Sequence, residues 1–358
     1  MSQTIHFAIV GDGWRVAFYL RIVSALPNLF ALDGLVVRDA AKGQSLEQTW
    51  GVRTYRSVEE LLAISKPEFV VTCVSWEPNP ALVEQLTMHG LPILSETPPA
   101  PNLESLKHLA ELAANGARIQ VAEQYIYQPH HAARLALVAS GAIGKVSEAQ
   151  VSICHGYHGI SLMRHFLGIG YENASITARS FNSPLIGGPG RDGPPTSEQH
   201  TTSSQVLAWF DFGDRLGVYD FTGDQYFSWV RGQHLLVRGE RGEIADMQAS
   251  YLLDYATPMT INLERQVAGA NGNLEGLYLK GITGGGKWYY RNSYIPAPLS
   301  DEELAITSTL IRMGTYARGE GAGPYSLAEA CQDRYLDLMI EQALHSKQAV
   351  TTETQLWV

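Results

Sequence analysis

Two glycines follow the first apolar run of the chain, and their spacing suits the binding of a diphosphate. Ile5–Val10 is mostly apolar, and the next six residues read Gly-Asp-Gly-Trp-Arg-Val, a GxGxxG-like turn with valine in place of the third glycine. Glycines permit a tight turn and a close approach to a pyrophosphate, while the start of a helix supplies N–H donors. We expect Gly11, Gly13, Trp14 and Arg15 to bind a nicotinamide dinucleotide, NAD or NADP. The alternative is a glycine turn without a ligand.

The end of the second apolar run carries charges of both signs. A NAD-specific site has an acid here, because a carboxylate accepts a hydrogen bond from the ribose 2′-hydroxyl. This chain has Arg38 followed by Asp39. Arg38 could pair with a 2′-phosphate or stack on adenine, whereas Asp39 could hold the ribose hydroxyl. Both cofactors remain candidates, and the alternative for each residue is a solvated charge in a turn.

A histidine near the middle of the chain has the chemistry for proton transfer. Histidine titrates near neutral pH, so His158 is a candidate general acid or base, and Tyr157 beside it is a second candidate proton donor. The alternative is an interior histidine without a chemical role. His155 lies three residues away, but in a strand that leads into a helix the two need not share a face. Carboxylates at metal-binding spacing are lacking nearby, so we expect no metal.

The segments that must position these residues alternate between strand and helix in the first third of the chain. Short apolar runs indicate strands of a parallel sheet, and helical periodicity returns between them. The expected strands are Ile5–Val10, Leu35–Val37, Phe69–Val74, Pro92–Leu94 and Ile119–Ala122, with helices after Val16, after the capping box of Ser57 and Glu60, at Ala81–His89 and after Leu103. The pattern predicts a doubly wound parallel sheet, the Rossmann arrangement.

Beyond residue 123 the pattern changes to alternating strands, which predicts a mainly antiparallel α+β domain. The expected elements are a helix at Pro129–Ser140, strands at 147–155, 173–181, 204–212, 216–222 and 233–238, and helices at 301–317 and 327–345. Two glycine-rich stretches, Gly187–Pro195 and Gly281–Gly286, are expected to be mobile loops at a sheet edge or over a cleft.

Length and charge narrow the possible classes of protein. A chain of 358 residues suggests two domains, 1–123 and 124–358, and the C-terminal helices could pack back on the first. A net charge of −10 without a dense Lys/Arg run argues against a nucleic-acid partner. Three cysteines without paired spacing, no leader-like start and no long apolar window predict a cytoplasmic protein that does not span a membrane.

Several motifs, taken in order, resemble those of the Gfo/Idh/MocA oxidoreductases. They are the opening strand–turn–helix unit, Glu96-Thr97-Pro98, the run Ser140–Val146 and the later Gly239–Ile244, and the resemblance covers nearly the whole chain. It implies a Rossmann domain joined to an α+β domain with an open sheet. It also implies an NAD(P)-dependent enzyme that oxidises or reduces a sugar or polyol. Dimers or tetramers would form through the exposed face of the open sheet.

The catalytic pattern of the family is altered at three motifs. The family's Glu-Lys-Pro reads Glu96, Thr97 and Pro98, so the lysine that sits by the nicotinamide and the reacting hydroxyl is lost. Thr97 could still hydrogen-bond the nicotinamide amide or a substrate hydroxyl, with Glu96 on the cofactor side. The motif Asp-x-Gly-x-His-x-x-Asp keeps only Gly156 and His158. His158 is therefore the best remaining acid or base.

Further positions are expected near the cofactor or substrate. The family's Pro-Asn-x-x-His is replaced by residues 75–79, of which Ser75, Trp76 and Asn79 are expected at the cofactor. Gln124 follows the last strand of the first domain and is expected to face cofactor or substrate. One of the two tyrosines that follow it, Tyr125 or Tyr127, could face the cleft. Arg164 and His165 are expected to be solvated or to cap a helix.

Three functions are compatible with these residues. The first is oxidation or reduction of a sugar or polyol hydroxyl, with hydride transfer to or from nicotinamide and His158 as the acid or base. The second is a redox-neutral glycosidase or lyase that oxidises a hydroxyl transiently and returns the hydride, with Tyr157 or Tyr125 as an extra acid or base. The third is a nicotinamide-binding sensor without catalysis.

Overall fold

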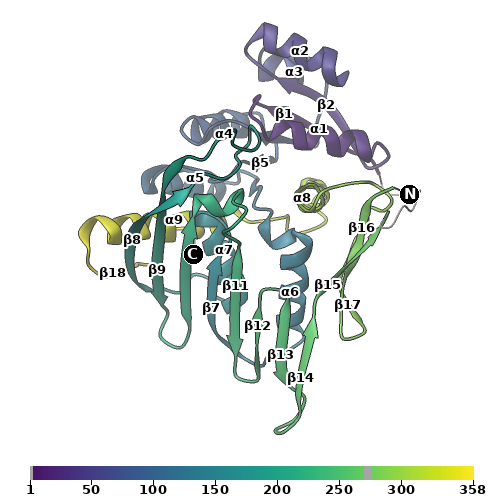
Figure 1. Cartoon of the computed structure of the whole chain (residues 1–358). Coiled ribbons are helices and arrows are strands. Elements are labelled where there is room, and N and C mark those ends of the chain that lie inside the picture. The colour runs from purple at the N-terminus through teal and green to yellow at the C-terminus, as the bar shows by residue number, and fades with distance from the viewer. Residues whose placement is uncertain (1–2, 270–275) are drawn as a thin grey trace.

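The computed structural model describes residues 3–269 and 276–358. Its N-terminal part is a parallel sheet with the strand order β3-β2-β1-β4-β5-β6 (Figure 1). The strands are β1 (Ile5–Val10), β2 (Phe30–Val36), β3 (Thr54–Tyr55), β4 (Phe69–Thr72), β5 (Ile93–Ser95) and β6 (Ile119–Val121). The helices are α1 (Val16–Ala25), α2 (Ala40–Trp50), α3 (Val58–Leu62), α4 (Asn79–Met88) and α5 (Leu103–Ala114). The predicted Rossmann sheet is confirmed, and its order reverses between β1 and β4, where such sheets bind ligands.

Burial explains why the apolar runs form the central strands. Phe7 and Ile9 on β1 are fully buried, and the ring of Phe7 stacks on that of Phe69 on β4 with centroids 5.5 Å apart. Full burial of such a side chain stabilises the fold by about 1.5–3 kcal/mol. The strand that leads into the glycine turn is therefore among the most firmly held segments of the sheet.

A second, mixed sheet carries most of the remaining chain. Within the described residues its order is β14-β13-β12-β11-β7-β10-β9-β8-β18; β7 and β10 run parallel and the other neighbours antiparallel. Its strands are β7 (Val146–Ser152), β8 (Ser175–Ile186), β9 (His200–Asp211), β10 (Leu216–Thr222), β11 (His234–Gly239), β12 (Gly242–Ala245), β13 (Gln248–Leu252), β14 (Pro258–Asn262) and β18 (Val350–Thr351). Helices η1 (Tyr125–Tyr127), α6 (Pro129–Ala139), α7 (Gly156–Leu167), η2 (Gly223–Tyr226) and α9 (Leu327–Ser346) accompany it. The predicted mainly antiparallel sheet is confirmed.

One of the two expected glycine-rich loops is instead a strand. Gly281 and Gly284 belong to β16 (Tyr278–Gly284), which pairs with β15 (Glu264–Ala268) and β17 (Lys287–Arg291). A Cβ atom on Gly281 would lie 2.7 Å from the Trp288 ring. Glycine is needed there for close packing of β17 rather than for mobility. The other stretch, Gly187–Pro195, lies in the connection between β8 and β9.

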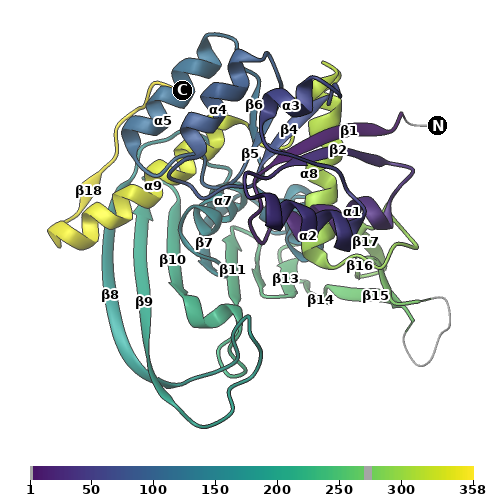
Figure 2. The same cartoon turned by 90° about the horizontal axis from the view of Figure 1, so that it is seen from above.

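The C-terminal helices contact the first sheet. Helix α8 (Asp301–Ala317) crosses β1 and β4 (Figure 2), and α9 contacts β6 and α5. A Cβ atom on Gly314 of α8 would lie 2.7 Å from the side chain of Ile5, so helix and strand approach closely. The domain boundary at residues 123 and 124 stays a prediction. In the parts of the chain that the structure covers, no helix has the length and apolar character needed to cross a membrane.

Candidate active site

The glycine turn lies at the carboxyl end of β1, where the sheet order reverses. Gly11 has a φ of +120°, and a Cβ atom there would lie 2.2 Å from the carbonyl oxygen of Cys73. Only glycine therefore fits position 11. A Cβ atom on Gly13 would meet the same oxygen at 3.3 Å and no other atom within 4 Å. The turn is thus anchored to the residue after β4 on one side and leads into the N-terminus of α1, an arrangement that fits a dinucleotide diphosphate.

Trp14 and Arg15 use their side chains differently. The Arg15 guanidinium forms an ion pair with Glu302 on α8 and lies 4.6 Å from the centre of the Trp14 ring. Trp14 is 55% exposed, and the guanidinium of Arg191 stacks on it at 4.3 Å. The charge of Arg15 is therefore balanced inside the protein, whereas the indole of Trp14 is open to a ligand.

Asp39 has a structural task that the sequence analysis did not assign. Its carboxylate caps α2 by accepting a hydrogen bond of 2.9 Å from the backbone N–H of Lys42. The N–H groups of Lys42 and Ala41 lower the pKa of Asp39, so it stays ionised. The side chain of Arg38 is exposed. Asp39 is therefore engaged in capping α2, whereas the exposed side chain of Arg38 is available to a ligand.

We expect Arg38→Ala to raise the Kd for NADP about tenfold and to change the Kd for NAD less than twofold. The reason is that a guanidinium forms charge-assisted hydrogen bonds with the 2′-phosphate, a group that NAD lacks. Calorimetric titration of both cofactors measures the difference. Lys66→Ala, which removes an exposed charge elsewhere, serves as the control. An unchanged Kd for NADP in Arg38→Ala would contradict this role.

The segment after β4 differs from the prediction. Asn79 is fully buried; its side chain accepts a hydrogen bond from Thr72 and donates to Ser95 and to the carbonyl of Pro99, at 2.7–2.8 Å. It cannot reach a cofactor, because both polar atoms are used inside the protein. It ties β4 to β5 and to the segment that follows β5. Ser75 and Trp76 lie closer to the surface, and Trp76 is 43% exposed.

Glu96 and Thr97 follow β5 and form a compact polar corner. The Glu96 carboxylate accepts hydrogen bonds from the backbone N–H of Thr97 at 3.2 Å and from its hydroxyl at 3.4 Å. Burial raises the pKa of Glu96, while the nearby charge of Arg15 opposes that shift. The hydroxyl of Thr97 and the carboxylate of Glu96 thus stand where the family has its Lys and Glu, but a hydroxyl is not a base at neutral pH.

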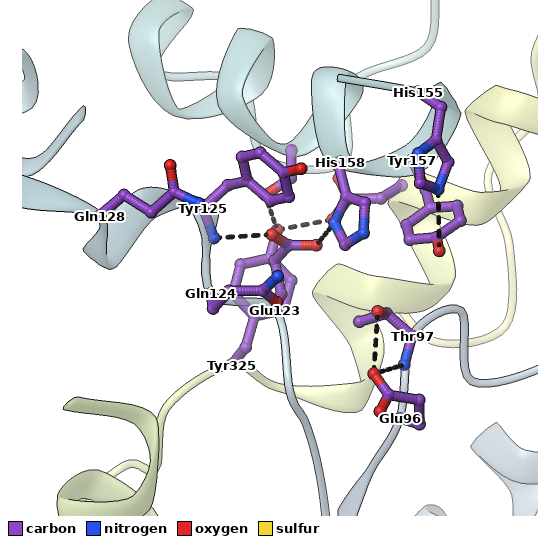
Figure 3. A network of polar contacts seen from close by, with 12 residues as sticks. Glu96, Thr97, Glu123, Gln124, Tyr125, Gln128, His155, Tyr157, His158 and Tyr325 are labelled. Atoms are coloured by element: carbon purple, nitrogen blue, oxygen red, sulfur yellow. Dashed lines mark hydrogen bonds and ion pairs between the residues drawn. The ribbon is translucent and has the colours of Figure 1, made fainter. Parts of the chain in front are cut away.

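A buried carboxylate partners His158. The carboxylate of Glu123, two residues after β6, lies 2.5 Å from Nδ1 of His158, and the two side chains are 2% and 5% exposed (Figure 3). Burial disfavours charge on both groups, so it raises the pKa of Glu123 to about 8 and lowers the pKa of His158 to about 3. The pair therefore titrates as a unit that holds one proton at neutral pH. Among the described residues, Nε2 of His158 has no hydrogen-bond partner.

Aromatic and imidazole side chains surround this pair. His155 and His158 lie three residues apart at the start of α7, with ring centres 5.0 Å apart, so the two histidines, which the sequence did not require to share a face, come together. His155 contacts the hydroxyl of Tyr226 at 2.6 Å. It also contacts the hydroxyl of Tyr157 at 3.3 Å (Figure 3). Burial raises the pKa of Tyr157, and the Thr97 hydroxyl opposes the shift. Tyr157 thus lies between His155 and the polar corner of Glu96 and Thr97.

Of the two tyrosines after Gln124, one joins the site. The Tyr125 ring lies 4.6 Å from the His158 ring, whereas the Tyr127 hydroxyl donates to the carbonyl of Pro324. No group of three or more potential metal ligands occurs in residues 3–269 or 276–358.

The carboxylate of Glu302 on α8 binds three polar side chains. It pairs with Arg15 and accepts hydrogen bonds from the amides of Gln124 at 2.9 Å and Gln128 at 2.7 Å. Gln124 is only 2% exposed, so its contact with cofactor or substrate stays a prediction. Through Glu302, the helix that packs on β1 connects the glycine turn with the residues that flank η1.

The prediction for Arg164 is wrong. Its guanidinium is buried, forms a 2.5 Å ion pair with Asp333 on α9 and donates to the carbonyl of Gly170. Asp333 in turn accepts a hydrogen bond of 2.6 Å from Tyr325, which contacts Ser161 on α7. The network holds α7, and hence His158, against α9. A helix with buried residues all round, as α7 is, has no solvated face for Arg164.

Residues 5–123 match the family model described as oxidoreductase family, NAD-binding Rossmann fold. Residues 5–123 are thus similar to the Rossmann domain of the Gfo/Idh/MocA oxidoreductases. The resemblance seen in the sequence is confirmed for this domain, and so is a nicotinamide cofactor of the NAD type. The fit is local as well, since the glycine turn of this Rossmann domain leads directly into α1.

Similar proteins extend the comparison to the rest of the chain. An inositol 2-dehydrogenase of Corynebacterium glutamicum is 27% identical over 150 residues, 41% of this chain and less than half, 44%, of that enzyme's length. A levoglucosan dehydrogenase solved with NADH and levoglucosan has a TM-score of 0.70 at 14% identity, covering 98% of this chain and 99% of that one. The WlbA dehydrogenase of Bordetella pertussis, solved with NADH and UDP-GlcNAcA, has a TM-score of 0.65 at 13% identity, covering 99% and 100%. These structural likenesses establish a shared fold across both sheets.

Three residues of the site escaped the sequence analysis. Glu123 directly follows the apolar run of β6, and a carboxylate at the end of a buried strand is a signal that could have marked it. Glu302 lies in the first turn of α8, where acidic residues are common as helix-stabilising groups, so its role has no sequence signal. Tyr226 is brought in by η2, which the sequence analysis did not predict.

Proposed function

We propose that this chain is an NAD(P)-dependent oxidoreductase that acts on a hydroxyl group of a sugar or polyol. The observation that supports it best is the buried pair of Glu123 and His158 beside the Glu96–Thr97 corner, in a chain with the Rossmann domain of this family. The inositol and levoglucosan dehydrogenases to which the chain is similar act on polyol and sugar substrates by their names. When bound, the nicotinamide ring would accept or return a hydride at the carbinol carbon.

The residues of the chain handle the proton. Nε2 of His158 takes the hydroxyl proton as the carbinol is oxidised, while the proton on Nδ1 moves to the Glu123 carboxylate. Burial favours this outcome, because the pair ends with both groups neutral instead of holding an imidazolium against a carboxylate. The Thr97 hydroxyl donates a hydrogen bond to the substrate or accepts one from it. Only Glu123 and His158 change their protonation state.

The proposal is tested by mixing the purified protein with NAD or NADP and a panel of inositols, aldoses and anhydrosugars. Growth of nicotinamide absorbance over multiple turnovers with at least one substrate is the expected result. His158→Gln on the same panel should remove the signal. Cofactor binding without turnover on any substrate would overturn the proposal and favour a sensor that lacks the family's lysine.

We expect the rate of substrate oxidation to rise with pH up to about 8 and then to level off. Oxidation needs the form of the pair that can accept a proton, and this form is the minor one below the raised pKa of Glu123. The rate therefore changes tenfold per pH unit on the acid side, and the reverse reduction falls as pH passes through the same value. Measurement of kcat/KM from pH 5 to 10 shows both.

The role of Glu123 is tested by the same measurement of kcat/KM against pH. Glu123→Gln removes the titrating carboxylate but keeps a side chain of similar shape, so the inflection near pH 8 should disappear as well as the rate falling. A lower rate with an unchanged profile would show that Glu123 only supports packing. Glu84→Gln, which alters an exposed carboxylate on α4, should leave the profile unchanged.

A second candidate function is redox-neutral cleavage of a glycoside. It is favoured by one observation, the contact of the Tyr157 hydroxyl with Nε2 of His155 at 3.3 Å, which offers a second acid or base beside the His158 ring. Such chemistry removes one proton from a hydroxyl and another from the neighbouring carbon, and so requires two such groups. Release of an aryl group from aryl glycosides with no net change in nicotinamide absorbance would distinguish it.

A further inference from the structure

The connection between β8 and β9 carries a tight turn with an arginine at its tip. Gly190 and Gly193 exchange backbone hydrogen bonds of 3.0 and 3.2 Å, which leaves Arg191 and Asp192 as the two tip residues. Gly193 has a φ of +111°, a conformation that suits glycine. The backbone that bears Arg191 is therefore held by hydrogen bonds of its own.

The tip of this turn contacts the cofactor turn of the other domain. The guanidinium carbon of Arg191 lies 4.3 Å from the centre of the Trp14 ring, within the range of a cation–π interaction. Trp14 follows Gly13, and its ring also has the Arg15 guanidinium at 4.6 Å. Two segments more than 170 residues apart in sequence thus lie side by side next to the glycine turn, the expected binding site of the diphosphate.

The charges around the cofactor turn single out Arg191. Arg15 is neutralised by Glu302, and the ammonium of Lys42 lies 2.8 Å from the carboxylate of Asp12 within the turn itself. Arg191 has no carboxylate within 4.0 Å among residues 3–269 and 276–358. It is thus a cation without a counter-charge, held by an aromatic ring next to a site for an anionic ligand. A planar guanidinium can donate two parallel hydrogen bonds to a phosphate group.

We propose that Arg191 binds the diphosphate of the nicotinamide dinucleotide and that the Trp14 ring holds its guanidinium in place for this contact. The inference rests on the dinucleotide site of the proposed function and adds a ligand-binding residue from the second domain. It makes the β8–β9 connection part of the cofactor site. The proposed role of Arg191 does not depend on the substrate chemistry at His158. Measurements of cofactor binding alone therefore test this role.

Calorimetric titration of wild-type protein and of Arg191→Ala with three ligands tests the proposal. NAD and ADP-ribose both contain the diphosphate, whereas adenosine lacks it. Loss of the guanidinium should raise the Kd for NAD and ADP-ribose about tenfold and leave the Kd for adenosine within twofold. Arg191→Lys keeps the charge but not the planar fork, and should lie between the two. Arg179→Ala removes an exposed charge from β8 of the same hairpin and should match wild type.

The outcomes separate this inference from the function on which it rests. If Arg191→Ala binds NAD and ADP-ribose as wild type does, the arginine does not touch the diphosphate. An equal loss of affinity for adenosine would also overturn the proposal, because it would place the effect on the adenosine end or on the fold. A wild-type chain that binds none of the dinucleotides would overturn the proposed function as well.

Discussion

Replacement of His158 by glutamine is expected to lower kcat about 100- to 10,000-fold, the usual contribution of a general acid or base. In the proposed function the imidazole exchanges a proton with the substrate, and no other described side chain beside it combines a free ring nitrogen with a buried carboxylate partner. Glutamine retains a hydrogen-bonding group for Glu123, so the local packing should persist. The Kd for the cofactor should change less than twofold, because the glycine turn proposed for the dinucleotide follows β1, whereas His158 lies on α7.

Steady-state kinetics and a cofactor titration on the same preparations measure both quantities. His108→Gln changes a histidine on α5 that pairs with Glu84 at the surface, and it should behave as wild type. If His158→Gln kept wild-type kcat, the proton acceptor would have to be sought elsewhere, first at Tyr157. Tyr157→Phe is therefore measured alongside.

Replacement of Asp333 by alanine is expected to cost about 3–5 kcal/mol of unfolding free energy. The change leaves the Arg164 guanidinium buried without its counter-charge, since both side chains are only 3% exposed, and it removes the carboxylate that accepts a hydrogen bond from the Tyr325 hydroxyl. Urea unfolding followed by circular dichroism measures the loss. Activity should fall as well, because α7 carries His158 and is held to α9 by this pair.

A double variant tests the explanation rather than the contact alone. In Arg164→Met with Asp333→Leu neither charge remains, so most of the lost stability should return. Asp214→Ala removes one partner of an exposed ion pair with Lys145, and it should hardly move the unfolding midpoint. Equal losses in the single and double variants would mean that the network contributes through shape and not through charge.

The sequence predicts the first sheet well because its strands are apolar on both faces. Runs such as those around Phe7 and Phe69 have few alternative structures, and the glycine turn follows directly from the first of them. Two strands that were missed, β14 at the edge of the second sheet and β15 beside β16, expose most of their residues and show no apolar alternation. Gly281 looked like a loop residue because the sequence does not show that Trp288 packs over it.

The residues of the site also fall into those that the sequence predicts and those that it does not. Local motifs locate the glycine turn, Thr97 and His158, since each is recognised from its immediate neighbours. Contacts across long sequence separations are invisible to such reasoning: Glu123 is 35 residues from His158, and Glu302 is 287 from Arg15. Asn79 shows the converse, because the residue was expected at the cofactor but is enclosed by Thr72 and Ser95.

The packing of α8 on β1 brings together segments that lie far apart in the sequence. Leu304, Leu310 and Met313 lie in the same apolar cluster as Ile5 and Phe7. During synthesis, the opening sheet would emerge from the ribosome long before the helix that covers this face of it. A fragment that ends after β6 would leave that face exposed to water and prone to self-association, so the nucleotide domain is not separable from the chain's final fifth.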